Sequence, residues 1–318
     1  MTDASFLCPG PEYEVAALLL AILWDYLYPY HSGFMLSIHP VHVSYVLALK
    51  MYRPRSSRAR GLGIWLLVMS VNLTCYGALL YAAYVVSPVV WVLAASYIVK
   101  VSASLRLLLD EVYAVARSLA RGDLAGARQH AQGLVRRPLD REDEGHVASA
   151  AIESLAESLN DGFISPLFWL LLLGPLGALS QRVANTLDGA LGFKDPDHAD
   201  VGWASAWADT LINYVPARLT AALIVLASGR PASMARSLRS WLRCRGLTES
   251  RNAGHPMSAM AGALGVTLEK RGHYRLCSCF GRMPDSGDVA KAVNVAAAAS
   301  IIGVLLICAA ILLAGRLA

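Results

Sequence analysis

Charged residues are scarce in this chain. Of 318 residues only 16% are Asp, Glu, Lys or Arg, whereas 56% are hydrophobic, and the mean hydropathy is +0.46. A soluble domain of this length does not need so much apolar material to fill its core. The composition therefore indicates an integral membrane protein.

Several familiar motifs are also absent. The chain contains no G-x-x-x-x-G-K-[ST] or G-x-G-x-x-G nucleotide motif, no H-E-x-x-H zinc motif and no serine nucleophile elbow. Any nucleotide must therefore bind in an unconventional way. The six cysteines are scattered, which argues against a disulfide framework. No aromatic and basic module of the kind that binds nucleic acid is present, so no nucleic-acid partner is expected.

Long uncharged runs predict about four membrane spans. Residues 61–99 carry no charge, and Ser87-Pro88 near their middle predicts a tight turn, because proline removes a backbone donor and breaks a helix. The first apolar run lacks a basic n-region and an A-x-A cleavage pattern, so we expect the first helix to be retained. The expected spans lie near residues 13–30, 62–86, 88–109 and 292–315.

Basic residues gather in two places, which sets the expected orientation. One group lies in residues 50–60, directly after the first span, and another lies in a basic loop expected over residues 229–290. Short basic loops mark the cytoplasmic side and contact the head groups of the lipid bilayer. The segment 110–160 alternates in charge and is expected to be a helical cytoplasmic portion.

Two further apolar runs make poor spans. Residues 163–181 carry a Gly174-Pro175 break, and residues 211–228 contain a proline and an arginine. Irregular backbone at membrane depth is tolerated where it lines a wet cavity, so we expect re-entrant or broken helices that return residues 182–209 to the cytoplasmic face. The predicted fold is all-α, a polytopic integral membrane protein with a single catalytic domain over residues 1–318.

A polar stripe precedes the first of these runs. Glu153, Glu157, Asn160 and Asp161 stand at i, i+4, i+7 and i+8, which places them on one face of a helix. Four acceptor side chains repel one another unless a cation or a donor lies among them. A solvated surface face is the simpler explanation, but the run FISPLFWLLLL follows directly and points the stripe toward the membrane boundary. The stripe is therefore a candidate functional site.

A second set of polar groups follows in the chain. It comprises Asn185, Asp188, Lys194, Asp209, Asn213, Arg218, Asn252 and His255, together with Trp203 and Trp207, one helical turn apart. Helix capping or packing explains each polar group singly, whereas their shared context favours a joint site. The two tryptophans either stack on a large planar ligand or anchor the chain at the membrane interface.

The runs ESLAESLNDG, NTLDGALGFKD and WADTLINYVPAR, with HPV at His39–Val41 and NAGHPMSAMAGALGV from Asn252, carry a family resemblance. In order and spacing they resemble the adenosylcobinamide-phosphate synthase family of cobalamin biosynthesis (CobD/CbiB), most closely over residues 150–266. Three phrases depart from that family. Tyr28-Pro29-Tyr30 stands where G-D-P is usual, Arg136-Arg137-Pro138 replaces G-R-D, and His255 and Ser258 replace a tryptophan and a glutamate.

The resemblance implies a multispanning enzyme of the cell membrane whose active site faces the cytoplasm. Its reaction would join (R)-1-amino-2-propanol phosphate, or the free amino alcohol, to a propionate carboxylate of adenosylcobyric acid and give adenosylcobinamide phosphate. ATP and Mg²⁺ would serve as co-substrate and metal, and the adenosylcorrinoid would be the substrate. Other late cobalamin enzymes and a second copy of the chain are further partners that this implies.

With that chemistry in view, each candidate residue receives an expected role. Carboxylates are expected to bind Mg²⁺ or act as general base, basic groups to contact phosphate, and amides to orient substrates. The first group is Glu153, Glu157, Asp161 and Asp188; the second is Lys194 and Arg218; the third is Asn160, Asn185, Asn213 and Asn252, together with the acid Asp209. Trp203, Trp207 and His255 are expected as walls of the corrinoid pocket.

Two other functions stay open on the sequence. A secondary transporter for a corrinoid or an anion would also place acids and broken helices at mid-membrane, but it predicts an internal repeat, and none is found. A catalytically silent scaffold for late cobalamin enzymes predicts that substitutions in the acidic stripe are tolerated.

Overall fold

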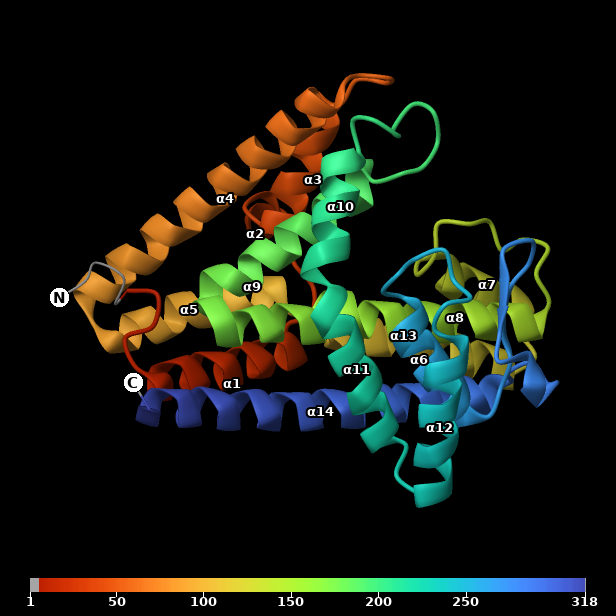
Figure 1. The fold of residues 1–318 in the computed structure, drawn as a ribbon. Coiled ribbons are helices and arrows are strands. Elements are labelled where there is room, and N and C mark those ends of the chain that lie inside the picture. The colour runs from red at the N-terminus through yellow and green to blue at the C-terminus, as the bar shows by residue number, and fades with distance from the viewer. Residues whose placement is uncertain (1–5, 318) are drawn as a thin grey trace. The chain divides into compact units, whose positions relative to one another are not determined.

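A computed structural model describes residues 6–317, and most of them lie in helices (Figure 1). Within those residues the only strands are a short antiparallel pair, β1 (Leu268–Lys270) and β2 (Tyr274–Leu276), so the predicted all-α fold is confirmed. The chain divides into two compact units. Unit 1 takes in the chain up to Ser104, Ser165–Asn213 and the chain from Leu305, and unit 2 takes in Leu105–Ile164 and Tyr214–Val304.

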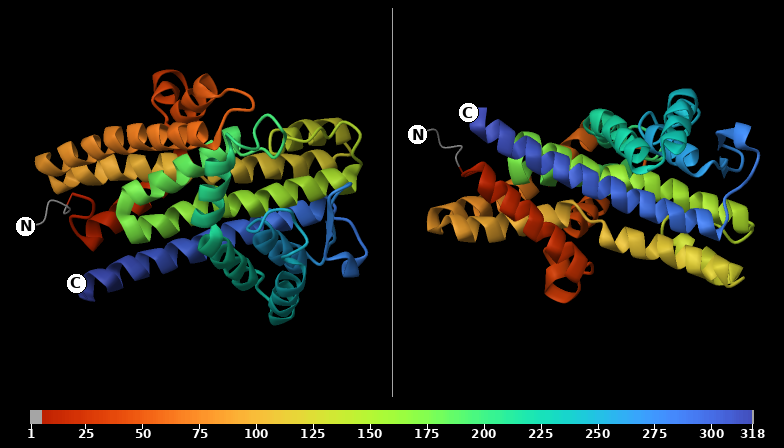
Figure 2. Two further views of the ribbon diagram at one scale, coloured as in Figure 1. Left: turned by 45° about the horizontal axis from the view of Figure 1, so that its top comes forward. Right: turned by 90° about the horizontal axis from the view of Figure 1, so that it is seen from below.

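Unit 1 is a bundle of helices around an apolar core. Its helices are α1 (Pro11–Leu27), α2 (Gly33–Ser37), α3 (Pro40–Met51), α4 (Arg58–Val86), α5 (Pro88–Ser102), α9 (Ser165–Leu191) and α10 (Trp203–Ile212). α5 packs against α1, α4 and α9, and Figure 2 shows α4 and α5 side by side. Trp91, Ile98 and Leu179 are fully buried in the core that these helices share.

Unit 2 is built around α8. Its elements are α6 (Arg106–Ala120), α7 (Leu124–Gln132), α8 (Glu144–Leu159), the π-helical turn η1 (Asn160–Ile164), α11 (Tyr214–Ala227), α12 (Pro231–Cys244), α13 (Gly254–Leu264), the β1–β2 hairpin and the 3₁₀ turn η2 (Ser278–Phe280). α8 contacts α6, α7, α13 and β1. The last helix, α14 (Ser286–Leu317), contributes residues to both units.

Local sequence explains where several helices begin. The side chains of Ser57, Ser87 and Asp143 accept backbone N–H groups in the first turns of α4, α5 and α8. These residue types satisfy N–H groups that have no partner within the helix. Pro88 holds the first position of α5, where its missing N–H is not needed. The turn predicted at Ser87-Pro88 is therefore confirmed.

Within residues 6–317, four helical stretches are long and apolar enough to cross a membrane, or five if α10 and α11 count as one bent span, which confirms a multi-pass membrane protein. They are Arg58–Val86, Pro88–Ala120, Glu144–Leu191 and Ser286–Gly315. Three of them coincide with predicted spans. The predicted span at 13–30 is instead the 17-residue α1, which is shorter than the four. It ends at Leu27 because the residue before Pro29 is disfavoured in a helix.

The region 163–181, expected to be a re-entrant or broken helix, lies within a longer helical stretch. α8 continues through η1 into α9, a helical stretch of 48 residues. Pro166 has no N–H to donate back into the preceding turn, which is a local reason for the wider π turn. The expected Gly174-Pro175 break is present inside α9. Gly174 has φ 66°, and a Cβ there would lie 2.8 Å from the carbonyl oxygen of Leu7, so glycine is required.

Two further expectations meet different outcomes. α10 and α11 are interrupted at Asn213, so the broken helix expected near 211–228 has its break at the start of that range. Residues 229–290 are not the basic loop that we expected, because they contain α12, α13 and the hairpin. α12 buries Ser237, Ser240 and Cys244 at helical spacing and places arginines between them. The high positive charge of this segment therefore belongs to a regular helix and not to a loop.

Candidate active site

Unit 2 brings together predicted site residues from three separate stretches of the sequence. α8 and η1 carry the polar stripe, α11 carries Arg218, α13 carries His255, and Asn252 lies just before α13. α11 packs against η1 and α13, and α13 packs against α8. Helix packing therefore places groups that are distant in the sequence within one unit.

Glu153 is the buried member of the stripe, with 6% of its surface exposed. Its Oε1 accepts a hydrogen bond from Ser149 Oγ at 2.6 Å, and its Oε2 accepts one from Tyr274 OH at 2.8 Å. Arg137 Nη2 lies 3.7 Å from the same Oε2. Burial and the adjacent carboxylate raise the pKa of Tyr274 above its usual range, so the phenol stays protonated as a donor. Oε2 of Glu153 thus ties α8 to the hairpin, while Oε1 holds Ser149 of the same helix, whose Oγ accepts the Glu269 N–H at 2.8 Å.

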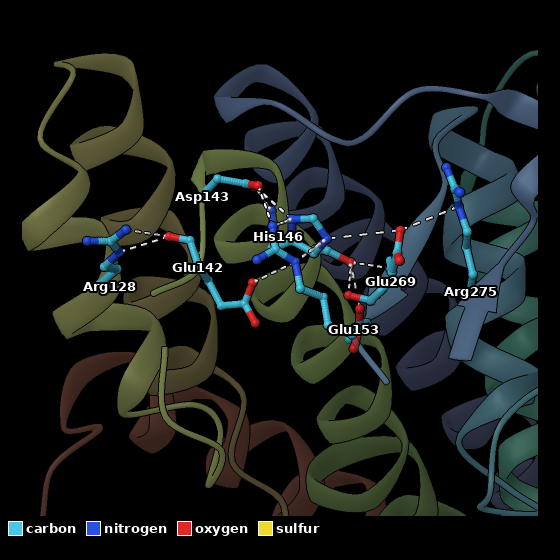
Figure 3. Close-up of polar contacts among 9 residues, drawn as sticks. Arg128, Glu142, Asp143, His146, Glu153, Glu269 and Arg275 are labelled. Carbon is cyan, nitrogen blue, oxygen red and sulfur yellow. Dashed lines mark hydrogen bonds and ion pairs between the residues drawn. The ribbon is translucent and has the colours of Figure 1, made fainter. Parts of the chain in front are cut away.

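A charged network continues from Glu153 toward the start of α8. Figure 3 shows His146 between Asp143 and Glu269, with Nδ1 at 2.7 Å from Asp143 and Nε2 at 4.0 Å from Glu269. Arg271 Nη2 contacts Asp143 Oδ2 at 2.6 Å. Burial acts to raise the pKa of Asp143, but hydrogen bonds from His146 and the charge of Arg271 outweigh it and lower the pKa. This network holds the hairpin on the first half of α8.

The second half of the stripe has different surroundings. Glu157 is exposed and Asp161 is partly exposed, whereas Asn160 is 2% exposed. Asn160 Oδ1 accepts from Thr220 Oγ1 at 3.0 Å, and its Nδ2 donates to Asp161 Oδ1 at 2.6 Å. Asn160 therefore anchors η1 on α11 and orients the Asp161 carboxylate, a positioning role compatible with the predicted one.

Arg218 and His255 occupy the neighbouring helices. The Arg218 guanidinium lies over the Tyr214 ring, 3.4 Å from its centroid, donates to the Tyr214 carbonyl, and has Nη1 3.4 Å from Asn252 Oδ1. Trp241 Nε1 donates to His255 Nδ1 at 2.8 Å. Burial, followed by the positive charges of Arg218 and Arg245, lowers the pKa of His255 to about 4. His255 is therefore neutral at pH 7, with its proton on Nε2.

In unit 1 the predicted amides surround a carboxylate. Asp209 Oδ1 accepts from Asn185 Nδ2 at 3.1 Å and from Asn213 Nδ2 at 2.8 Å. Gln181 Nε2 in turn donates to Asn213 Oδ1 at 3.1 Å. This chain of side chains joins the second half of α9 to the end of α10. Asn185, Asp209 and Asn213 therefore form one local cluster, as the sequence predicts.

The loop between α9 and α10 is fastened to the basic loop that follows α3. Arg55 pairs with Asp197 at 2.9 Å and Arg58 with Asp200 at 3.0 Å, while the Tyr52 and His198 rings stack at 4.5 Å. Residues 192–202 and 52–58 consequently lie on the same side of unit 1. The exposed Lys194 belongs to this loop.

Asp188 and the two tryptophans complete the predicted residues of unit 1. Gly192 donates its N–H to the Asp188 carbonyl at 2.7 Å, and a Cβ at Gly192 would collide with the Asp188 carboxylate. Glycine at position 192 therefore leaves room for the Asp188 carboxylate. Trp203 and Trp207 stack at 6.4 Å, and they are 42% and 59% exposed. Arg58 lies 5.5 Å from the centroid of Trp203.

The sequence model of the CobD/Cbib protein family matches residues 18–310. The chain belongs to the CobD/CbiB family. A probable cobalamin biosynthesis protein CobD of Aeropyrum pernix is 48% identical over 313 residues, or 98% of each chain. A protein of the same name from Methanothermobacter thermautotrophicus is 35% identical over 266 residues, 83% of this chain and 86% of its own. A cobalamin biosynthesis protein CobD of Rhodobacter capsulatus is 44% identical over 165 residues, 52% of each chain. No solved structure matches significantly.

The CobD/CbiB phrases, both one that is kept and two that depart from the usual pattern, have identifiable places in this structure. His39 of H-P-V caps α3, with its Nδ1 accepting the Val41 N–H at 3.3 Å. Arg137, in the phrase that replaces G-R-D, is the arginine beside Glu153. His255 and Ser258, which replace tryptophan and glutamate, are both buried in α13. The structure explains how these residues are held, and the roles assigned to the site residues stay predictions.

Some polar residues beside these clusters were missed in the sequence. Tyr274 lies outside the recognised motifs. Because its segment was expected to be a loop, nothing in the sequence marked it as a partner of Glu153. Lys100 and Asp25 are each 5% exposed, at the ends of apolar runs. A charged residue at the edge of a membrane helix was the available signal, since such a group is costly to bury without a function or a partner.

The predicted Mg²⁺ ligands can be compared with this arrangement. Across residues 6–317 no group of three or more His, Cys, Asp or Glu side chains is placed to hold a metal ion. Mg²⁺ commonly enters a site with a nucleotide, bound to one or two carboxylates and to phosphate oxygens. Glu157 and Asp161 are carboxylates of that kind, and their role in holding Mg²⁺ stays a prediction.

Proposed function

We propose that this protein acts in cobalamin biosynthesis by forming an amide between a propionate carboxylate of adenosylcobyric acid and (R)-1-amino-2-propanol phosphate, with consumption of ATP. The observation that carries the proposal is the family match over residues 18–310. This range includes the polar stripe of α8 and η1 and the amides around Asp209. The names of the relatives support the pathway, and the residue types support the reaction.

The reaction requires an activated carboxyl group, because an amine does not displace the oxygen of a free carboxylate. In the simplest route, the propionate oxygen attacks the γ-phosphorus of Mg-ATP and ADP leaves. The amine nitrogen then attacks the acyl carbon, phosphate leaves, and the nitrogen loses a proton to a base. Arg218 and Lys194 are suited to phosphate oxygens, and Glu157, Asp161 and Asp188 to Mg²⁺ or the proton.

The corrinoid is large and planar, so its site must have an open aromatic wall. The stacked pair Trp203 and Trp207 in unit 1 offers such a surface. The loop 192–202 next to it is fastened to basic residues 52–58. Basic loops mark the cytoplasmic side, and this supports a corrinoid site that is reached from the cytoplasm.

The proposal is tested with the full-length protein in detergent. The purified protein is incubated with adenosylcobyric acid, aminopropanol phosphate, ATP and Mg²⁺, and the product is identified by mass spectrometry. We expect Glu157→Gln and Asp188→Asn to lower product formation by about 100-fold or more, since they remove charge that binds the metal or accepts the proton. Thermal unfolding should remain close to that of the unmodified protein.

Glu144→Gln and Asp140→Asn are matched controls. Both residues are exposed, lie near the same part of unit 2 as the stripe, and belong to neither polar cluster. They should leave product formation unchanged. Full activity in both site variants would remove the residue assignment, and absence of product with the unmodified protein would overturn the proposed reaction. Accumulation of a corrinoid inside proteoliposomes without product would instead indicate a transporter.

A further inference from the structure

Unit 1 contains a basic cluster that the site described above does not use. Lys100, near the end of α5, is 5% exposed. Its Nζ lies 3.1 Å from His31 Nδ1 and 3.0 Å from His31 Nε2. The His31 ring meets His39 edge to face, with centroids 4.6 Å apart. Three segments of the chain thus place an ammonium and two imidazoles together.

One buried carboxylate accompanies this cluster. Asp25 is 5% exposed, attracts the Lys100 ammonium, and accepts a hydrogen bond from Ser104 Oγ at 2.9 Å. Burial, followed by the nearby His31, Arg182 and Lys100, lowers the pKa of His39 to about 3. Burial is the largest cause of this lowering, and the basic groups around His39 add to it. An anion in this place would be stabilised.

The donors present match the needs of such an anion. An ammonium has three N–H donors, and His31 accounts for one of those of Lys100. His39 is neutral and accepts the Val41 N–H through Nδ1, so its ring proton is on Nε2. His39 also stands at the N-terminus of the 12-residue α3, where the helix dipole favours negative charge. The cluster therefore combines a full charge, an imidazole donor and a helix terminus.

We propose that Lys100, His31 and His39 form a binding site for a phosphate monoester group. The inference rests on the proposed function, whose reaction brings two sources of this group, the amino alcohol phosphate and ATP. A doubly charged phosphate exploits both the ammonium and the helix terminus. The free amino alcohol, which is itself a cation, would be repelled.

The test measures binding to the full-length protein in detergent by isothermal titration calorimetry. Three ligands are titrated: (R)-1-amino-2-propanol phosphate, ATP and free 1-amino-2-propanol. We expect Lys100→Gln to weaken binding of one phosphorylated ligand at least about tenfold, with a smaller loss for His39→Gln, and to leave the free amino alcohol unaffected. Lys50→Gln, at an exposed lysine in the last turn of α3, is the control and should change nothing.

The pattern of losses identifies the source of the phosphate. A loss confined to amino alcohol phosphate assigns the site to that substrate, and a loss confined to ATP assigns it to the nucleotide; either supports the proposal. Unchanged affinity for both ligands in Lys100→Gln and His39→Gln overturns it. If Lys100→Gln does not fold, His31→Gln, at a half-buried position, takes its place under the same criterion.

Failure of this inference differs from failure of the proposed function. A protein that makes the amide while both variants keep full phosphate affinity loses the site and retains the function. A protein that binds phosphate through Lys100 but forms no product retains the site and loses the function.

Discussion

Glu153 and Glu157 stand one turn apart on α8, yet their surroundings are opposite. Glu153 is buried, and its oxygens are engaged by Ser149, Tyr274 and Arg137. Glu157 is exposed, next to η1 and its Asp161. A buried carboxylate with its acceptors filled holds the fold together, whereas a carboxylate open to solvent can meet a substrate. One polar stripe therefore has a supporting half and a half available for chemistry, and the following variants test that division.

Removal of the buried carboxylate should have the largest effect on the fold. Glu153→Ala leaves Ser149, Tyr274 and Arg137 without their common partner, so we expect a loss of about 3 kcal/mol in the free energy of unfolding. Glu157→Ala should cost less than about 1 kcal/mol, as is typical of exposed charges. Thermal unfolding in detergent measures both. Equal losses in the two variants would contradict the division.

The other half of the stripe should respond in activity instead. Asp161→Asn keeps an oxygen that can accept from Asn160 but removes the charge, so we expect product formation to fall about 100-fold with an unchanged unfolding temperature. Mass spectrometry of the product and thermal unfolding are read on the same sample. A drop in stability with activity per folded molecule preserved would place Asp161 with Glu153 in the supporting half.

A smaller change tests the hairpin's contribution separately from the other contacts of Glu153. Tyr274→Phe removes one hydrogen bond to Glu153 and leaves the one from Ser149 and the ion pair with Arg137, so we expect a loss of about 1 kcal/mol. Increased hydrogen exchange should appear in β1 and β2. No change in either measurement would show that the hairpin is held without this bond.

The smallest effect should come from Asp143, through pH. Its pKa is lowered in the folded protein, so its contribution is complete above the ordinary value of 3.8 and is lost as the pH falls through the folded value. Asp143→Asn keeps a side chain that caps α8 but removes the pairing with Arg271. The unfolding temperatures of the two proteins should differ slightly at pH 7, by the equivalent of less than about 1 kcal/mol, and converge toward pH 3. A difference that grows on acidification would contradict the sign.

Much of the fold followed from patterns that the sequence displays directly. The uncharged runs located α4, α5 and α14, and the Ser87-Pro88 and Gly174-Pro175 breaks appear where proline and glycine require them. The length of the stretch Glu144–Leu191 did not follow, because its acidic stripe resembled a soluble helix. Residues 229–290 were misassigned as a loop. The buried positions of α12 are small polar residues separated by arginines, so its sequence shows no apolar helical repeat.

The candidate site followed only in part, for a related reason. Spacing placed Glu153 and Glu157 on one face, but it could not show which one lies under the hairpin, since that depends on Tyr274 more than a hundred positions away. Likewise Asn185, Asp209 and Asn213 were identified by type, while their convergence depends on how α9 and α10 pack. Contacts between distant segments are set by packing, and no local pattern records them.

Because residues 192–202 are held against residues 52–58, the side of the membrane on which one loop lies is also the side of the other. A thiol reagent that labels a cysteine introduced beside Arg55 shows which aqueous compartment that loop faces. Lys194, in the loop paired with it, faces the same compartment. The sidedness of the Asp188 region can thus be read from a substitution at the basic loop, far enough from the polar cluster to leave its chemistry alone.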